Sequence, residues 1–178
     1  MNFKELSLRG SYLVNFEAHD DIRGSFFRNY CKKEINKVTN FNLVQANLSI
    51  NHTKHTLRGF HYQNKRFSEP KLFFPIIGSV YNVFIDLRKN SKTFLKYLAT
   101  HIDSKKKEGI YIPKGFANAF LTTSKLTIIQ YFMGNYYAPK HYKGFSYNDK
   151  FFNVRWPCEP KVISDKDQNY KPFRLSDL

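Results

Sequence analysis

Residues 71–87 read KLFFPIIGSVYNVFIDL, and this stretch decides the fold class. Two apolar runs, 71–77 and 80–87, flank the dipeptide Gly78-Ser79. Both runs are rich in β-branched and aromatic residues, which favour strands, and Gly and Ser are typical turn residues. The stretch therefore predicts two neighbouring strands joined by a tight turn.

Further strands are predicted on both sides of this pair. The predicted ranges are 10–16, 43–50, 97–102, 109–112, 117–121 and 127–133. Turn residues separate them, as in Lys89-Asn90-Ser91 and Pro113-Lys114-Gly115. Seven or more short strands at close spacing, without helical crossovers, predict an all-β antiparallel sandwich or barrel.

Helices are predicted to be short and peripheral. Residues 32–37 form the only plausible helix of the first half, and SDKDQ at 164–168 predicts a short helix with Ser164 as its N-cap. The tail beyond residue 135 carries four prolines and a glycine, which keep it irregular. Without internal repeats or a low-complexity linker, residues 1–178 are expected to form one domain with a wrapping tail.

Composition is that of a soluble globular protein. The chain has 178 residues, of which 42% are hydrophobic and 17% aromatic. It contains no apolar run of about 18 residues, which a membrane span would need, and its N-terminus lacks an apolar signal core. We expect a cytoplasmic protein, in which Cys31 and Cys158 are free thiols.

The net charge of +15 raises the question of nucleic acid as a partner. Of the 29 basic residues, 21 are lysines spread along the whole chain, and only residues 105–107 form a run. This dispersion does not favour nucleic-acid binding. A small anionic ligand such as a nucleotide diphosphate would use the same positive field at a single site.

Residues 57–63, LRGFHYQ, place an imidazole and a guanidinium in a segment that otherwise has strand character. An ammonium follows at Lys71. Charged and titratable groups are rarely placed close to a barrel interior without a partner or a use. His61 is therefore the first candidate for a catalytic base.

Several segments occur in a characteristic order: LRGFHYQ, KLFFPIIGSVYNVFIDLRKNSKTF, IYIPKGFANAFL, YYAP, ND, RWP and SDKDQ. In this order and spacing, residues 10–172 resemble the dTDP-4-dehydrorhamnose 3,5-epimerase family. The resemblance implies a metal-free, cofactor-independent cupin-type jelly-roll barrel that acts on nucleotide-linked 4-keto sugars. Members of this kind supply sugars for bacterial surface polysaccharides such as capsule and lipopolysaccharide.

The implied reaction makes specific chemical demands. The hydrogens on C3 and C5 are acidic because both carbons flank the ketone at C4. Inversion needs a base on one face, a proton donor on the other, and a cation near the ketone oxygen. By resemblance, His61 is the base, Asp167 orients its second ring nitrogen, Tyr131 is the proton donor, Lys71 is the cation, and Arg58 binds phosphate or sugar.

The resemblance also implies a nucleotide site and a dimer. The positions matching nucleotide or phosphate ligands are Arg23, Phe26, Gln45, Asn47 and Lys166, with Tyr136 stacking on the base. In the family the N-terminal strand crosses to the neighbouring subunit. Arg23 and Phe26 are therefore expected to serve the partner's site in a homodimer.

Three positions depart from the pattern, all in ligand recognition. Arg28 and Tyr142 stand where many members have Glu, and Asn118 replaces a His close to the sugar. Losing two carboxylates removes specific hydrogen-bond acceptors. We therefore expect either a dTDP-4-keto-6-deoxyhexose or a different substrate such as a GDP- or CDP-linked 4-keto sugar, including a heptose. Inversion at C3 alone, or at both C3 and C5, stays open.

Three other functions agree less well with the sequence. A metal-dependent cupin enzyme needs two His separated by one residue, and here the residue two after His61 is Gln63. A nucleotide-sugar 3,4-ketoisomerase shares the substrate class, but the motifs resemble the epimerases better. A non-catalytic module binding nucleotide sugars or nucleic acid would not need the four catalytic candidates together.

Overall fold

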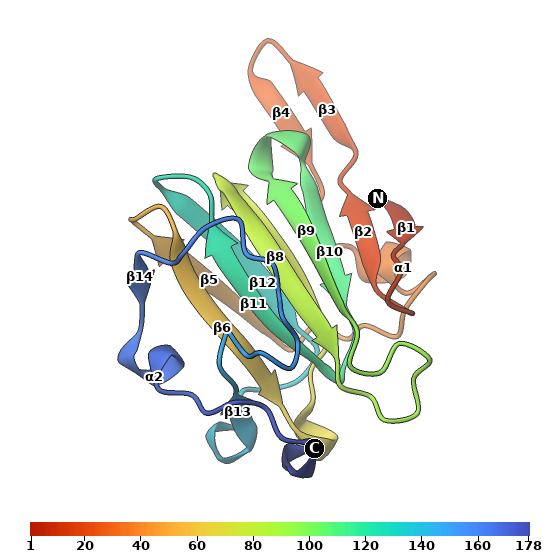
Figure 1. The fold of residues 1–178 in the computed structure, drawn as a ribbon. Helices are drawn as coiled ribbons and strands as arrows, with labels where there is room; N and C mark the ends of the chain where they lie inside the picture. Colours follow the sequence, from red (N-terminus) through yellow and green to blue (C-terminus); the bar gives the residue numbers. More distant parts are fainter.

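Two β-sheets pack against each other in the computed structural model (Figure 1). The structure describes residues 1–178 apart from the side chain of Lys65. In spatial order, the first sheet contains β1 (Asn2–Glu5), β2 (Tyr12–Asn15), β10 (Glu108–Ile112), β7 (Lys71–Ile77), β12 (Thr127–Met133) and β5 (Gln45–Asn51). The second contains β13 (Tyr142–Gly144), β6 (Thr56–Gln63), β11 (Phe116–Thr122), β8 (Ser79–Asp86) and β9 (Tyr97–Asp103).

Smaller elements surround the two sheets. The strands β3 (Ala18–Asp21) and β4 (Gly24–Phe27) form a separate hairpin, and β14 (Val162–Ile163) pairs in parallel with β6. The helices are α1 (Lys32–Ile35) and α2 (Asp165–Gln168), with 3-10 turns η1 (Lys65–Phe67), η2 (Ser104–Lys106), η3 (Pro139–His141) and η4 (Leu175–Asp177). No helix in the described part of the chain is long and apolar enough to cross a membrane.

The prediction of a mostly antiparallel β protein is confirmed. The predicted ranges 71–77 and 127–133 coincide with β7 and β12, and the other predicted strands overlap observed ones within a few residues. The predicted helix at 32–37 is shorter and ends at Ile35. Five strands were not predicted. β1 is polar, β3 and β4 flank a turn, and β13 and β14 are too short to show a pattern.

The core between the sheets is made of large apolar side chains from both. Seven of these side chains are nearly inaccessible to solvent and lie in one cluster. The first sheet contributes Phe73, Ile110 and Ile129, and the second contributes Val80, Phe84, Ile102 and Phe120. Burying a side chain of this kind contributes about 1.5–3 kcal/mol. The alternation of side chains along each strand therefore fixes which face of each sheet is internal.

The irregular tail covers the outer face of the second sheet. Phe145, Phe152 and Phe173 pack on Val83 and Ile85 of β8 and on neighbouring residues of β6 and β11. As a result β8 is buried on both faces, which explains its nearly continuous apolar sequence. The tail is part of the core rather than an appendage.

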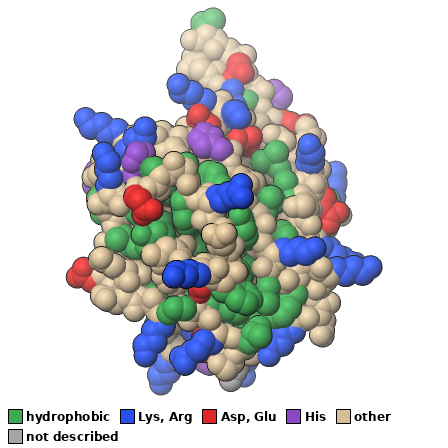
Figure 2. Space-filling view, in the orientation of Figure 1, with side chains coloured by type: hydrophobic (Ala, Val, Ile, Leu, Met, Phe, Trp, Pro, Cys, Tyr) green, Lys and Arg blue, Asp and Glu red, His purple; other side chains and the backbone are tan. Residues whose placement is uncertain are grey.

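The β3–β4 hairpin extends away from the two sheets (Figure 1). Its tip and second strand expose two large apolar side chains, Ile22 and Phe26. Basic side chains are scattered over the face drawn in Figure 2 and do not form one continuous patch. This scatter agrees with the dispersed lysines of the sequence.

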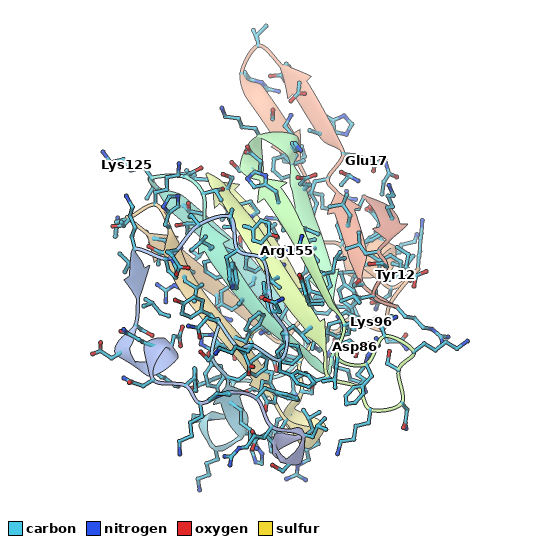
Figure 3. The ribbon with its side chains drawn as sticks, in the orientation of Figure 1. Tyr12, Glu17, Asp86, Lys96, Lys125 and Arg155 are labelled. Carbon is cyan, nitrogen blue, oxygen red and sulfur yellow. The ribbon has the colours of Figure 1, made fainter. Side chains whose placement is uncertain are left out.

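Asp86 holds the loop between β8 and β9 in place. It is the last residue of β8 and lies near Lys96 (Figure 3). Its fully buried carboxylate accepts hydrogen bonds from Arg88 Nη2 at 2.7 Å and from the hydroxyls of Ser91 and Thr93, each at 2.6 Å. Burial alone would raise the pKa of Asp86, but these donors together lower it below its ordinary value of 3.8. The charged carboxylate therefore stabilises the fold above that pH.

We expect Asp86→Asn to lower the free energy of unfolding at pH 7 by about 2–3 kcal/mol, because charged hydrogen bonds to a buried group are lost. A group whose pKa is lowered in the folded state begins to lose its contribution as the pH falls past its ordinary value, and loses the rest as the pH falls through the lowered value. The difference between wild type and variant, measured by urea denaturation, should therefore begin to shrink below about pH 5 and continue to shrink below pH 3.8. Glu159→Gln, at an exposed site, is the control; a difference independent of pH would contradict this account.

Candidate active site

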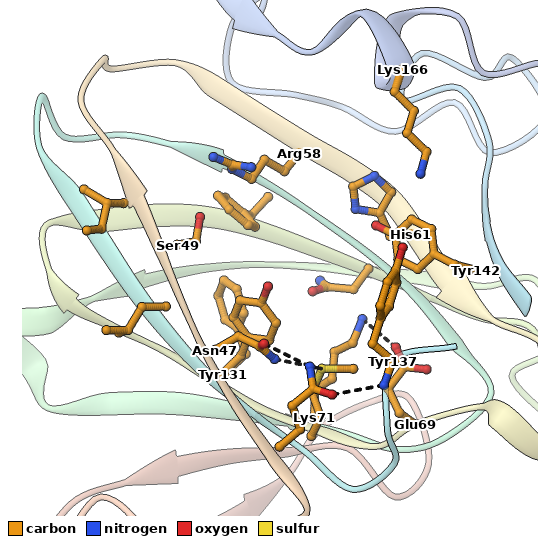
Figure 4. Close-up of a pocket in the computed structure, with 17 residues that line it drawn as sticks. Asn47, Ser49, Arg58, His61, Glu69, Lys71, Tyr131, Tyr137, Tyr142 and Lys166 are labelled. Carbon is orange, nitrogen blue, oxygen red and sulfur yellow. Dashed lines mark hydrogen bonds and ion pairs between the residues drawn. The ribbon is translucent and has the colours of Figure 1, made fainter. Parts of the chain in front are cut away.

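A pocket of about 490 Å³ opens between the two sheets (Figure 4). Its walls come from β5, β7 and β12 of the first sheet and from β6 and β11 of the second. The polar and charged side chains lining it are Gln45, Asn47, Ser49, Arg58, His61, Glu69, Lys71, Asn118, Tyr131, Tyr137, Tyr142 and Lys166. Of the four residues expected to be catalytic, three line this one pocket, and the fourth, Asp167, lies directly behind His61.

His61 and Asp167 form a hydrogen-bonded pair. His61 Nε2 lies 2.7 Å from Asp167 Oδ1, and the other carboxylate oxygen accepts the backbone N–H of Gly59 at 3.0 Å. Asp167 is 4% exposed. Burial alone would raise the pKa of this carboxyl group, but the bond to His61, the N–H of Gly59 and the charge of Lys166 lower it overall. Asp167 is therefore an anion at neutral pH.

Local structure brings these two distant residues together. β14 pairs in parallel with the start of β6, with Ile163 opposite Leu57, and so carries α2 alongside the LRGFHYQ segment. Ser164 is the N-cap of α2 and accepts the N–H of Asp167 at 3.2 Å, as predicted from the sequence. Gly59 has φ +118°, and a Cβ there would lie 2.6 Å from Ala119 Cα. Only glycine allows β6 to approach β11 this closely.

Because Nε2 is bound to a carboxylate, it carries the imidazole proton and Nδ1 is left unprotonated. Nδ1 is therefore the atom of His61 that can accept a proton. The fixed tautomer and the anion beside it are what a general base requires.

Tyr131 and Lys71 come from the sheet opposite His61. Tyr131 lies on β12 and Lys71 is the first residue of β7. The Lys71 ammonium lies 3.0 Å from a carboxylate oxygen of Glu69, which also lines the pocket (Figure 4). A phenol, an ammonium and an imidazole therefore line the same cavity from opposite walls.

Two further cations line the pocket. Arg58 donates from Nε to Asn51 Oδ1 at 2.9 Å, and Lys166 Nζ lies 4.6 Å from the centre of the Tyr142 ring. In the part of the chain whose side chains are described, neither cation forms an ion pair with a carboxylate. Both are thus available to an anionic ligand.

Two of the three unusual residues lie beside His61. The Tyr142 ring centre is 5.2 Å from that of His61 and 5.4 Å from that of Tyr137. Burial raises the pKa of Tyr142 well above its ordinary value, so this hydroxyl stays protonated. Asn118 is paired in register with His61, and its Nδ2 donates to Asn82 Oδ1 at 2.7 Å and to the carbonyl of Val83 at 3.0 Å.

The structure separates the expected nucleotide-binding residues into two groups. Gln45 and Asn47 on β5 line the pocket together with Lys166. Arg23 and Phe26 lie on the β3–β4 hairpin, outside the pocket of their own chain. Arg28, the third unusual residue, also lies outside it and pairs with Glu34.

The residue expected to stack on the base lies outside the pocket of its own chain. Tyr136 is 66% exposed, whereas its neighbour Tyr137 lines the pocket. Stacking of Tyr136 on the base stays a prediction. The backbone N–H of Tyr137 donates to Gln45 Oε1 at 3.0 Å, which holds this residue at the wall. Two adjacent tyrosines in a loop give no alternation from which to choose between them.

Glu69 and Met133 also line the pocket, although neither was expected from the sequence. Met133 Sδ lies 3.0 Å from Asn47 Nδ2 and ends β12. Glu69 is 5% exposed and lies two residues before Lys71, a spacing that allows both side chains to reach the same cavity. That spacing was the signal available in the sequence. No three His, Cys, Asp or Glu side chains among those described are grouped as metal ligands would be.

Comparisons with known proteins agree with this geometry. The family model described as dTDP-4-dehydrorhamnose 3,5-epimerase matches residues 5–174. The dTDP-4-dehydrorhamnose 3,5-epimerase of Shigella flexneri is 34% identical over 175 residues, covering 97% of this chain and 96% of that protein. The enzyme of the same name from Escherichia coli K12 is 30% identical over 181 residues, covering 100% and 96%.

Solved structures extend the comparison. The dTDP-4-dehydrorhamnose 3,5-epimerase of Bacillus anthracis, with TDP and PPi bound, superposes with a TM-score of 0.93 at 31% identity, covering 97% of this chain and 99% of that one. The dTDP-6-deoxy-D-glucose-3,5-epimerase of Legionella pneumophila, in complex with dTDP-4-keto-L-rhamnose, superposes with a TM-score of 0.90 at 28% identity, covering 96% and 92%. The chain therefore belongs to the dTDP-4-dehydrorhamnose 3,5-epimerase family, a family of nucleotide-4-keto-sugar epimerases.

Proposed function

We propose that this protein inverts C3, C5 or both in a nucleotide-diphosphate-linked 4-keto sugar. The observation that carries the proposal is the buried His61–Asp167 pair in a pocket whose opposite wall holds Tyr131 and Lys71. A base and a proton donor on opposite sides of a bound ring are the minimum that an inversion requires. The family membership supports the substrate class.

His61 Nδ1 removes the proton from the carbon next to the ketone. The C–H electron pair forms the C=C bond of an enolate, and the carbonyl electrons move to the oxygen at C4. Tyr131 then gives its hydroxyl proton to the same carbon from the other face, which inverts it. His61 ends protonated and Tyr131 ends as a phenolate, and proton exchange with solvent restores both.

The cations share the negative charges of the substrate and the intermediate. Lys71 is proposed to donate to the ketone oxygen, where charge develops as the enolate forms. Arg58 and Lys166, which have no carboxylate partner among the described residues, are proposed to bind the diphosphate. The three cations thus have separate roles in one pocket.

The identity of the nucleotide sugar has two candidates. A dTDP-4-keto-6-deoxyhexose follows from the names of the relatives and from the TDP-bound and dTDP-sugar-bound neighbours. A GDP- or CDP-linked 4-keto sugar, including a heptose, is favoured by the departures at Arg28, Asn118 and Tyr142. Of these, Tyr142 places a large aromatic ring and Asn118 a neutral amide beside His61.

We further propose that the protein is a homodimer in which the β3–β4 hairpin docks on the partner. The hairpin extends from its own chain and exposes Phe26 to 76%. Arg23 also lies there, paired only with its neighbour Asp21 across an exposed turn among the described residues. An exposed hairpin that carries an apolar ring and a guanidinium is suited to completing a nucleotide site on a second copy.

His61→Asn should lower deuterium incorporation from D₂O at the sugar carbons by about 10²–10⁴-fold, because the base is removed. Tyr131→Phe should lower epimer formation by a similar factor, and any deuterium that still enters should do so with retention. Binding of the nucleoside diphosphate should change by less than about threefold, because neither group is assigned to the phosphates. Tyr147→Phe, outside the pocket, is the control. Unchanged exchange in both variants would contradict the assignment.

The substrate can be identified by incubating the protein in D₂O with dTDP-, GDP- and CDP-linked 4-keto sugars, hexose and heptose. We expect turnover with at least one, with deuterium at C3, C5 or both, counted by NMR and mass spectrometry. Turnover of the dTDP-hexose alone would contradict a changed specificity. A product whose ketone has moved to C3 would instead identify a 3,4-ketoisomerase.

Sedimentation should give a species of about 42 kDa, twice the chain mass of 21.1 kDa. Phe26→Asp should weaken both dimer formation and nucleotide binding by about tenfold or more, because it places a charge in an apolar contact. Leu175→Asp, exposed in η4 and outside the pocket, is the control for added charge. A monomeric wild type with full activity would contradict the proposal that the β3–β4 hairpin completes the site of a partner subunit.

A further inference from the structure

We infer that Glu69 is a positioning residue, which fixes the Lys71 ammonium for the sugar ketone and keeps it from binding the diphosphate. The inference rests on the proposed function of the pocket and adds to it a residue that sequence motifs did not indicate. Its basis is the burial of Glu69, its two donors, and the contrast between Lys71 and the other pocket cations.

Glu69 is a buried anion in a pocket that must accept an anionic substrate. Its side chain is 3% exposed and that of Lys71 is 12% exposed. Burying a carboxylate costs several kcal/mol unless it is paired and hydrogen-bonded. Here Oε1 lies 3.0 Å from Lys71 Nζ, and Oε2 accepts from Gln63 Nε2 at 3.1 Å. Both oxygens therefore have a donor within the chain itself.

Gln63 holds Glu69 in a rigid frame. Its Nε2 has two hydrogens and lies within hydrogen-bond distance of three acceptors, which are Glu69 Oε2 at 3.1 Å and the carbonyls of Phe67 at 2.9 Å and Tyr136 at 3.1 Å. Its Oε1 accepts the N–H of Ala138. One buried amide thus ties together β6, the loop before β7 and the loop after β12. The carboxylate is therefore not free to rotate away from Lys71.

The chain around Glu69 is also closely packed. Pro70 accepts the N–H of Gly134 at 2.9 Å, and a Cβ at Gly134 would lie 2.6 Å from Pro70 Cγ. Pro70 has a restricted φ and joins Glu69 directly to Lys71 at the start of β7. A lysine side chain has a flexible stem of four carbons, so its ammonium can reach many positions. The Glu69 carboxylate selects one of these positions for the Lys71 ammonium.

Lys71 differs from the other pocket cations in its charge balance. Arg58 bonds to the neutral Asn51, and Lys166 lies over the Tyr142 ring. Lys166 also interacts with the charge of Asp167, but neither cation is in an ion pair with a carboxylate among the described side chains. Lys71 and Glu69 together carry no net charge. A diphosphate entering the pocket is therefore attracted to Arg58 and Lys166 more than to Lys71.

This division has a consequence for catalysis. An ammonium bound to phosphate would not be available to donate to the ketone oxygen, where negative charge develops only in the transition state. An ammonium held in place by Glu69 can donate an N–H to that oxygen without reorganisation when the charge forms. Glu69 therefore lowers phosphate affinity at Lys71 and raises the rate of proton abstraction.

The test is Glu69→Gln in two backgrounds, wild type and Lys71→Met, with inorganic pyrophosphate as the probe. In wild type, Glu69→Gln should bind pyrophosphate about 3–10-fold more tightly by calorimetry, because Lys71 becomes an unpaired cation. In the Lys71→Met background, the same change should alter binding by less than twofold. Weaker or unchanged binding, an equal effect in both backgrounds, or no measurable binding by any variant would overturn the inference.

Kinetics give a second readout. The substrate for this measurement is the 4-keto sugar that the wild type is found to turn over. Glu69→Gln should lower kcat about tenfold in the wild-type background, with no comparable rise in KM. In the Lys71→Met background it should lower kcat by less than twofold. A loss of equal size in both backgrounds would indicate a structural role only. If wild type exchanges no deuterium with any 4-keto sugar, the proposed function fails, and the pyrophosphate series still decides the role of Glu69.

Two further variants control for folding. Glu108→Gln removes a buried carboxylate on β10 outside the pocket, and it should leave pyrophosphate binding and turnover unchanged. Glu69→Asp keeps the charge but shortens the reach to Lys71. It should give pyrophosphate affinity between those of wild type and Glu69→Gln, whereas affinity below wild type would overturn the inference.

Discussion

The hydrogen bond between His61 and Asp167 is the interaction on which the arrangement of the pocket depends. It joins strand β6 to a short helix 106 residues further along the chain. The same carboxylate binds the backbone of Gly59, so one buried anion sets both the tautomer of the imidazole and the position of the strand that carries it. The tail that wraps the second sheet therefore supplies the partner of His61 as well as part of the core.

Pairing of two sheets provides what one sheet cannot. Alternate residues along a strand point to the same face, so β6 directs His61 and β12 directs Tyr131 into the space between the sheets. The proposed base and the proposed proton donor consequently line the cavity from opposite walls. The large apolar core beside the pocket keeps the two sheets rigid relative to each other, which holds the walls at a constant separation.

Charge in the pocket is distributed unevenly, and the burial of individual groups explains how. Asp167 is held as an anion by its donors, Tyr142 is held protonated by burial, and Lys71 is neutralised locally by Glu69. Among the described residues that line the pocket, Arg58 and Lys166 are the cations of Lys and Arg without an ion-pair partner. The high net charge of the chain is thus much less informative about its ligand than the few cations that line the cavity.

By itself the sequence determined most strands of the two sheets, the Ser164 cap and the family, because alternation, turn residues and motifs are local properties of the chain. It also indicated His61, Tyr131, Lys71 and Asp167 by resemblance, though not the wall on which each would lie. Only the tertiary structure decided that Tyr137 rather than Tyr136 lines the pocket and that Glu69 pairs with Lys71. These contacts depend on how loops pack between the sheets, and no periodic pattern encodes that packing.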